Sequence, residues 1–226
     1  MPKFSLSPSA LNLFNDCPRC FWMDKVKKVK RPRGIFPSLP SGMDREIKLH
    51  FDRYRSQHCL PPELRGKQFE DTYLFDEVDL LERWRSWRTG LVVQDKSGNT
   101  LSGALDDLLV KGNLFIPFDY KTKGSPTTIE AAQRYYTNQL DCYALMMEAN
   151  KLKTAGYGYL LYYSPKEVRE DGNVLFELQP IKLKTDPQRA MKTFNDALKL
   201  LNGPEPKASA RCEYCGWIAN LKKIQK

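Results

Sequence analysis

Two strand-like runs, each with an acidic residue inside mostly apolar sequence, constrain this chain more than any other feature. The first, residues 101–110, contains Asp106; the second, from residue 114, contains Asp119 and leads into Lys121. Side chains two apart on a strand share a face, so Asp119 and Lys121 project together, and the neighbouring run can bring Asp106 beside them. Two carboxylates and an ammonium on one partly buried face are costly unless a cation joins them. This pattern predicts a hard divalent metal, with a lysine that orients or activates water.

A simpler arrangement fits the same residues, namely exposed hairpin charges with Asp119 and Lys121 as a surface pair. A bare Asp-x-Lys motif arises often by chance. Two neighbouring features favour the metal site: Gly-x-x-Asp on the preceding run, and a following helix in which Gln139 and Tyr143 lie one turn apart. Residues one helical turn apart face the same way, so both side chains can reach a single ligand.

Periodicity and turn signals predict alternating helices and strands. We expect an antiparallel meander of residues 91–94, 101–110 and 114–120, a long helix over about 128–150, and a buried strand over 157–163. A helix capped by Ser7 and leading into residue 22, a helix over 42–57 capped by Ser41, and a final helix from Asp186 to residue 201 complete the set. This order indicates an α/β fold.

Composition sets broad limits on the chain. Its 226 residues, 41% of them hydrophobic, suffice for one domain with a real core. A net charge of +9 favours a polyanionic partner, although a basic balance alone is a weak signal. No apolar run reaches membrane-spanning length, and the first residues lack the apolar stretch of a signal peptide, so we expect a cytoplasmic protein with no membrane partner.

Four of the six cysteines form two Cys-x-x-Cys pairs at opposite ends of the chain: Cys17 with Cys20, and Cys212 with Cys215. In a chain without an export signal such pairs bind metal more often than they form disulfides. If both pairs close one four-thiolate site, it suits a 4Fe-4S cluster or tetrahedral Zn²⁺. The C-terminal tail has no core of its own, so a metal would tie the two termini together. The alternative is two separate pairs of reduced thiols.

Residues 82–88 interleave arginine with Trp84 and Trp87. Such a mixture can stack on bases and pair with phosphates. It can equally be a helix that packs both tryptophans inward. The sequence leaves both interpretations open.

Taken together, these motifs resemble the RecB-like branch of the PD-(D/E)XK nuclease superfamily, especially the iron–sulfur exonucleases associated with CRISPR adaptation. The resemblance covers nearly the whole chain. It rests on a Ser-x-Ser-x-Leu-like opening (Ser7, Ser9, Leu11), Cys17-Pro18-Arg19, Gly103-Ala104-Leu105-Asp106, Asp119-Tyr120-Lys121, Gln139-Leu140-Asp141-Cys142-Tyr143 and a cysteine-bearing C-terminal tail.

The resemblance implies a restriction-endonuclease-like core, with a central mixed sheet flanked by helices. We expect one nuclease domain over 1–226, its core at about 40–202, and a small cysteine-clipped subdomain from about 5–34 plus 203–226. The implied site residues are the metal ligands Asp106 and Asp119, the backbone carbonyl of Tyr120, the catalytic Lys121, and Gln139 and Tyr143 near the metal or the scissile phosphate.

The chain departs from the family in two places. Relatives carry a metal-binding histidine four residues after a glycine in the first core helix, whereas here Gly42 is followed at that distance by Glu46. A glutamate oxygen suits Mg²⁺ or Mn²⁺ at least as well as imidazole, so we expect Glu46 as the third ligand, with His50 in reserve. The family's cluster takes one N-terminal and three C-terminal cysteines, whereas this chain offers two and two. The resemblance favours 4Fe-4S over Zn²⁺.

The implied function is a Mg²⁺- or Mn²⁺-dependent deoxyribonuclease that hydrolyses phosphodiester bonds. We expect a single-strand exonuclease acting on single-stranded DNA or free ends, in repair, recombination or CRISPR adaptation, where a protein partner would join it. The alternative is a catalytically inactive DNA-binding module of a repair or recombination complex.

Overall fold

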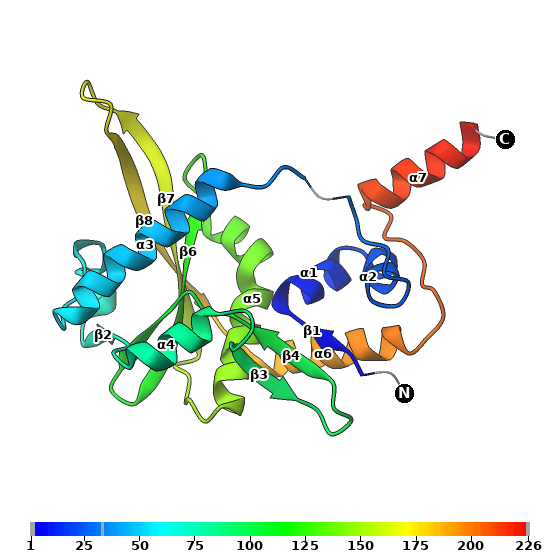
Figure 1. The fold of residues 1–226 in the computed structure, drawn as a ribbon, viewed down its shortest axis with the longest axis horizontal. Helices are drawn as coiled ribbons and strands as arrows, with labels where there is room; N and C mark the ends of the chain where they lie inside the picture. The colour runs from blue at the N-terminus through cyan, green and yellow to red at the C-terminus, as the bar shows by residue number, and fades with distance from the viewer. Residues whose placement is uncertain (1–2, 33, 225–226) are drawn as a thin grey trace.

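A five-stranded mixed sheet forms the centre of the computed structural model, which describes residues 3–32 and 34–224 (Figure 1). Its strands, in spatial order, are β2 (Thr72–Leu74), β5 (Asp107–Lys111), β6 (Leu114–Thr122), β7 (Tyr157–Val168) and β8 (Val174–Lys184). Strands β6 and β7 are parallel, and the other neighbours are antiparallel. Parallel neighbours need a long crossover, which helix α5 (Ile129–Ala149) provides. The predicted α/β class is confirmed.

Each face of this sheet has its own hydrophobic core. Helix α5 and helix α6 (Pro187–Leu201) supply the core on one face, and helix α3 (Ser38–Ser56) supplies it on the other. Because side chains alternate along a strand, Phe118 and Tyr120 of β6 pack toward α3, against Phe51. The residue between them, Asp119, therefore lies on the α5 face, and Lys121 lies there with it. The predicted shared face is confirmed.

A second sheet of three short strands lies beside the first. It is built from β1 (Ser5–Leu6), β4 (Thr100–Gly103) and β3 (Leu91–Gln94). The predicted single meander is therefore wrong, because residues 101–110 bend at 104–106 and divide between the two sheets. At the bend the backbone groups bond to the end of helix α4 (Val78–Arg85) instead of to a strand: Leu105 N–H donates to the carbonyl of Trp84, 2.9 Å, and Arg85 Nε to that of Asp106, 2.9 Å. Asp106 thus lies in a bend, not in a strand.

The N-terminal helix is interrupted where the sequence prediction made it continuous. Ser7 caps helix α1 (Pro8–Asp16) as expected, but the chain is extended at Cys17 before helix α2 (Pro18–Lys25) begins. Pro18 explains the break, because the ring of a proline disfavours helical dihedrals at the preceding residue. The expected start of the next helix is also wrong: α3 begins three residues before Ser41.

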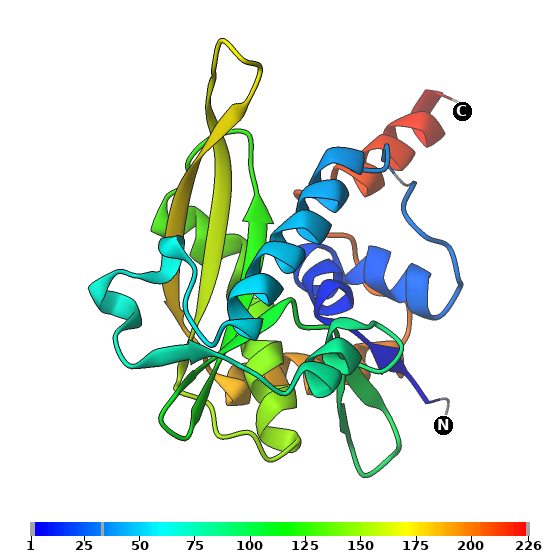
Figure 2. The same cartoon turned by 60° about the vertical axis from the view of Figure 1, so that its left-hand side comes forward.

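The later helices agree closely with the sequence. Thr128 caps α5, and Asp186 caps α6, each by accepting a hydrogen bond from a backbone N–H. Strands β7 and β8 are longer than expected and extend as a hairpin beyond the rest of the sheet (Figure 2). The loop after α3 contains two single-turn 3₁₀ helices, Pro62–Leu64 and Lys67–Phe69.

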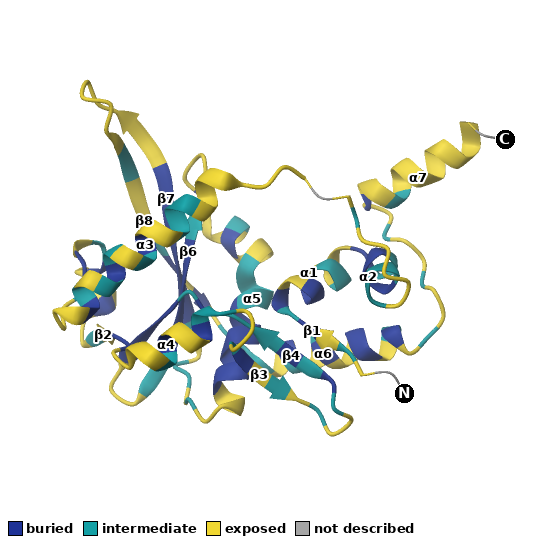
Figure 3. Ribbon diagram, in the orientation of Figure 1, coloured by how far each residue is buried: buried dark blue, intermediate teal, exposed yellow. Residues whose placement is uncertain are grey.

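The C-terminal tail forms a helix, α7 (Glu213–Ile224), that has no buried residue (Figure 3). This agrees with the expectation that the tail lacks a core. Of the predicted terminal subdomain, Arg33, Gln225 and Lys226 lie outside the described residues. Within the part of the chain that the structure describes, no helix is both long enough and apolar enough to cross a membrane.

A buried charge network joins helices α3 and α4 to the start of β5. Asp107 is fully buried, and its carboxylate accepts hydrogen bonds from Arg55 Nη2 (2.6 and 2.7 Å), Arg85 Nη2 (3.2 Å) and the Tyr120 hydroxyl (2.6 Å). Asp52 also accepts from Arg85, at 2.7 and 3.0 Å. Two carboxylates thus balance two guanidiniums, so no buried charge of this network is left unpaired.

We expect Asp107→Asn to lower the free energy of unfolding by about 3–5 kcal/mol, because Arg55 and Arg85 would keep buried charge without its main partner. Urea unfolding followed by circular dichroism measures this change. The matched control is Asp196→Asn, which alters a half-exposed ion pair with Lys192 and should cost less than about 0.5 kcal/mol. Equal costs for the two variants would contradict a stabilising network.

Candidate active site and cysteine cluster

Asp119 lies at the centre of a polar cluster between β6 and α5. The side chain is 1% exposed, and Oδ1 accepts a hydrogen bond from Gln139 Nε2 at 3.1 Å and lies 3.5 Å from the Tyr143 hydroxyl. Gln139 Nε2 also contacts the Tyr143 hydroxyl at 2.7 Å. The one-turn spacing predicted that Gln139 and Tyr143 can reach one group, and in the structure that group is Asp119.

Lys121 contacts the other oxygen of the same carboxylate. Its ammonium pairs with Asp119 Oδ2 and lies over the ring of Tyr136, 4.6 Å from the ring centroid. Oδ2 is nevertheless a buried oxygen without a well-formed hydrogen bond. Burial raises the pKa of Asp119 to about 7, Lys121 opposes the rise, and the nearby Asp106 adds to it. The negative charge of Asp119 is therefore incompletely compensated by the protein.

Asp106 reaches the same place from the bend before β5. Its Oδ2 accepts a 3.4 Å hydrogen bond from the backbone N–H of Tyr120, the residue after Asp119. Its Oδ1 pairs with Lys48 of α3 at 2.8 Å. Burial disfavours the charged form of Lys48, but Asp106 and Asp44 outweigh it and raise its pKa. The structure thus brings the two predicted acids together and adds a lysine that the sequence did not single out.

Asp44 is an acidic residue beside the candidate site that the sequence analysis did not single out. The Lys48 ammonium that pairs with Asp106 also pairs with Asp44 Oδ2, at 2.9 Å, so it bridges the two carboxylates. The signal was present in the sequence, because Asp44 and Lys48 are four residues apart and so lie on one face of a helix.

The structure does not bring Glu46 or His50 into contact with the two acids. Glu46 is 59% exposed at its side chain and pairs with Arg45 at 3.0 Å. His50 Nε2 lies 2.8 Å from Glu63 Oε1, which also accepts a 3.2 Å hydrogen bond from the Tyr163 hydroxyl.

The donor set of the acidic cluster fits a hard divalent cation. Mg²⁺ and Mn²⁺ bind carboxylate and carbonyl oxygens, and the cluster offers Asp106, Asp119 and, across the Lys48 bridge, Asp44. A buried carboxylate with a raised pKa gains most from an added positive charge. The backbone of Tyr120 lies beside Asp106, so the carbonyl that the sequence prediction named belongs to the same neighbourhood.

The four cysteines of the two Cys-x-x-Cys pairs meet between the termini. All four sulfur atoms lie within 4.8 Å of one another. Cys20 Sγ is 3.5 Å from Cys212 Sγ and 3.6 Å from Cys215 Sγ, and Cys17 Sγ is 3.9 Å from Cys215 Sγ. The expectation that both pairs close one four-thiolate site is met. Thiolates around one tetrahedral Zn²⁺ stand about 3.8 Å apart, given a zinc–sulfur bond of about 2.3 Å.

The surroundings of the cysteine cluster favour the thiolate of Cys17, whereas burial raises the pKa of Cys20 and of Cys215. Arg31 donates a hydrogen bond to Cys212 Sγ at 3.3 Å and pairs with Asp16 at 2.6 Å. Burial disfavours the Cys17 thiolate, but hydrogen bonds from the backbone of Cys20 and Ser209 outweigh it and lower the pKa of Cys17 to about 7. A guanidinium beside four thiolates offsets the excess negative charge that remains when they bind a divalent ion.

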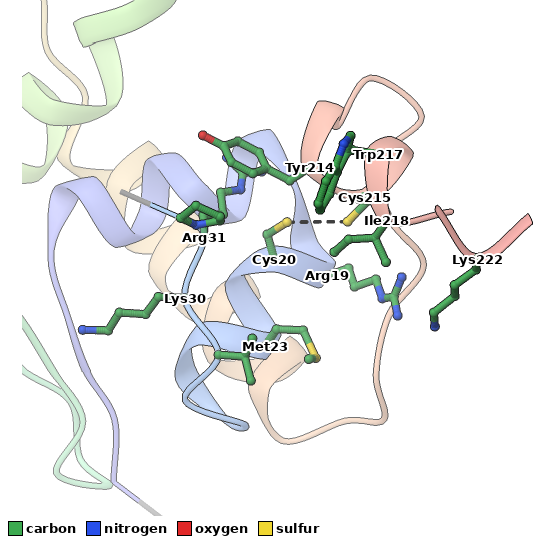
Figure 4. Close-up of a pocket in the computed structure, with 12 residues that line it drawn as sticks. Arg19, Cys20, Met23, Lys30, Arg31, Tyr214, Cys215, Trp217, Ile218 and Lys222 are labelled. Carbon is green, nitrogen blue, oxygen red and sulfur yellow. Dashed lines mark hydrogen bonds between the residues drawn. The ribbon is translucent and has the colours of Figure 1, made fainter. Parts of the chain in front are cut away.

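A cavity of about 270 Å³ adjoins this cluster (Figure 4). Cys20 and Met23 line it from α2, and Tyr214 and Trp217 line it from α7. Arg31 lies over the Tyr214 ring, 4.6 Å from its centroid. The cavity is remote from Asp119 in sequence and in fold, and its lining shares no residue with the acidic cluster.

Comparison with known proteins agrees with these observations. The family model of the PD-(D/E)XK nuclease superfamily matches residues 63–219, which is more than two thirds of the chain and begins after α3. The solved structure titled "Crystal structure of SSO0001" aligns with a TM-score of 0.50 at 15% sequence identity, covering 97% of this chain and 86% of that one. That likeness concerns the fold alone. A search of curated proteins gives no significant match.

The matched region contains Asp106, Asp119, Lys121, Gln139 and Tyr143, which the structure gathers around β6, the central strand of a mixed sheet flanked by helices. Sequence and architecture therefore agree, and the chain belongs to the PD-(D/E)XK nuclease superfamily.

Proposed function

We propose that the protein is a Mg²⁺- or Mn²⁺-dependent deoxyribonuclease that degrades single-stranded DNA from a free end. The observation that carries the proposal is the convergence of Asp106, Asp119 and Lys121 on one buried face, with Gln139 and Tyr143 bonded around Asp119. Superfamily membership supports phosphodiester hydrolysis. The choice of DNA, of single strands and of an exonucleolytic mode rests on the motif resemblance to RecB-like exonucleases, which also suggests a role in repair, recombination or CRISPR adaptation.

Asp106 and Asp119 would hold the metal, with the Tyr120 carbonyl and a third acid. For the third acid the geometry supports Asp44, whose carboxylate already shares Lys48 with Asp106. Glu46, with His50 in reserve, stays the prediction from motif spacing. A bound divalent ion lowers the pKa of water and neutralises charge on the phosphoryl group.

The protein side chains contribute orientation and charge. Gln139 and Tyr143 fix the rotamer of Asp119 through its Oδ1. Asp119 and the Tyr136 ring hold the Lys121 ammonium, and although burial disfavours its charge, Asp119 outweighs this and raises the pKa of Lys121. Lys121 therefore stays protonated, and it can position water and stabilise negative charge while the oxygen of water bonds to phosphorus and the bond to the leaving oxygen breaks.

A further proposal concerns the cysteine cluster and the domain arrangement. The sulfur separations support one tetrahedral ion, Zn²⁺. This ion would join residues of about 5–34 to residues 203–226 in a small subdomain beside a core of about residues 40–202. In the 4Fe-4S cluster implied by the resemblance each thiolate binds a different iron atom, so the sulfur atoms stand further apart than around a single ion.

The first experiment is degradation of end-labelled single- and double-stranded DNA with Mg²⁺, Mn²⁺ or a chelator. We expect metal-dependent cutting of the single strand, and a loss of about 100-fold or more with Asp119→Ala or Lys121→Ala. The control is the surface variant Asp196→Ala, with circular dichroism as the check on folding. DNA that stays intact but is still bound would contradict the proposal and favour the inactive DNA-binding module.

The metal ligands can be tested without turnover. We expect 1 mM Mn²⁺ to raise the Tm of the protein by about 5 °C when the acidic site starts without metal. An ion that binds only the folded state stabilises that state by mass action. Asp106→Asn should abolish the shift, Asp44→Asn should reduce it, and Glu46→Gln should leave it unchanged. A Tm shift that is lost with Glu46→Gln and kept with Asp44→Asn would show that Glu46, and not Asp44, is the third acidic ligand of the metal.

Elemental analysis of the purified protein tests the cysteine cluster. We expect about one zinc atom per chain, no iron, and no absorption at about 400 nm. Cys212→Ser should lose the zinc and lower the Tm, because metal binding is coupled to folding of the tail. A brown protein with about four iron atoms per chain would instead support the 4Fe-4S cluster.

A further inference from the structure

Trp87 is an exposed aromatic residue in a well-anchored turn. Its exposed fraction is 78%, whereas its neighbour Trp84 is buried against Phe75. The turn follows α4 and is closed by a 2.7 Å hydrogen bond from Thr89 Oγ1 to the carbonyl of Arg83. Of the two interpretations of residues 82–88, inward packing therefore holds for Trp84. Trp87 faces solvent and remains available for contact with a nucleic acid.

The turn is tied to the candidate metal site. The carbonyl of Trp84 accepts from Leu105 N–H, and Arg85 Nε donates to the carbonyl of Asp106, each at 2.9 Å. The same guanidinium is held by the buried Asp107. Trp87 follows two residues later, so its distance from Asp106 is fixed by hydrogen bonds on both sides of the bend.

A cavity of about 420 Å³ extends from Trp87 to Gln139 and Tyr143 of the polar cluster around Asp119. Gln139 and Tyr143, which hold Asp119, line it together with Trp87. The rest of its wall is made of small or hydroxyl-bearing residues: Ser7, Pro8, Ser9, Ser102, Gly103 and Ala104. Small side chains leave room for a flat group, and Trp87 is the one large ring among the lining residues outside the catalytic cluster.

The chemistry beside the cavity suits a nucleotide. The Arg88 guanidinium lies 5.0 Å from the centroid of the Trp87 ring, so an aromatic surface and a positive charge are presented together. Aromatic rings stack on nucleobases regardless of sequence, and arginine pairs with phosphate. Lys48 and Lys121 add positive charge at the acidic cluster itself.

We propose that Trp87 stacks on an unpaired base of the strand whose phosphodiester occupies the Asp106–Asp119 site. The inference rests on the nuclease function proposed above and extends it, because it names the residue that selects single strands. In a duplex both faces of an internal base are covered by neighbouring bases, so the ring can stack only on an unpaired base or a terminal one. Trp87 is then a specificity residue, and Arg88 is its partner for the adjoining phosphate.

The test compares two 15-nucleotide strands, an oligo-dT and an abasic strand with the same phosphates. Binding is measured by fluorescence anisotropy without added divalent metal, so no turnover is needed. We expect Trp87→Ala to bind the oligo-dT roughly 5- to 100-fold more weakly, the range found when a base-stacking aromatic is removed, and to bind the abasic strand like the wild type. Trp87→Phe should recover most of the affinity, because it keeps a ring.

The matched control is Trp217→Ala, which removes another exposed tryptophan, on α7, and should change neither affinity. In the cleavage assay Trp87→Ala should raise KM for single-stranded DNA and leave kcat within about two-fold, as expected for a binding contact. Unchanged binding of oligo-dT by Trp87→Ala in an active nuclease would overturn the inference and leave the proposed function standing. A wild type that binds neither strand and cuts no DNA would overturn both.

Discussion

Adjacent acidic residues at the start of β5 have different partners, and the candidate site depends on this difference. Asp107 turns toward α3, where Arg55, Arg85 and the Tyr120 hydroxyl pair with its charge completely. Asp106 pairs with Lys48 of α3 and accepts from the backbone N–H of Tyr120, so it lies beside Asp119, whose burial raises its pKa to about 7. Asp107 holds the bend in place, and the incompletely compensated carboxylate beside it is that of Asp119, which is proposed above as a metal ligand. The paired network of Asp107 thus fixes the backbone beside the incompletely compensated carboxylate of Asp119.

Much of this arrangement could be predicted from the sequence, because it follows from local periodicity. Strand alternation placed Asp119 and Lys121 on one face, and helical spacing placed Gln139 beside Tyr143; the structure agrees on both. The start of α6 at its cap Asp186 was also predicted, since a capping side chain acts within one turn of itself. The pairing of two distant Cys-x-x-Cys motifs was correct as well, although their occupant stays a prediction.

The errors concern features that depend on contacts between distant segments. The bend at Asp106 exists because the end of α4 supplies hydrogen-bond partners to Leu105 and Asp106. The sequence of residues 101–110 does not indicate these contacts with α4. Motif spacing predicts Glu46 as the third ligand and does not indicate that the orientation of α3 against the sheet brings Lys48 to Asp106, with Asp44 paired to the same ammonium. The break between α1 and α2, by contrast, follows from the local sequence, because Pro18 disfavours helical dihedrals at Cys17.

Lys48 and the cysteine cluster imply two different relations between metal and folding. At the acidic site Lys48 and Lys121 already pair with Asp106 and Asp119 and offset part of their charge in the protein alone, so the core can fold before an ion arrives. Helix α7 has no buried residue, so the ion proposed for the cysteine cluster would supply much of its attachment. With the proposed ions bound at both sites, a slowly added chelator would act in sequence, removing the ion at Asp106 and Asp119 while the core persists and loosening the terminal helix only later. The protein would pass through an inert but intact form on the way to losing its tail.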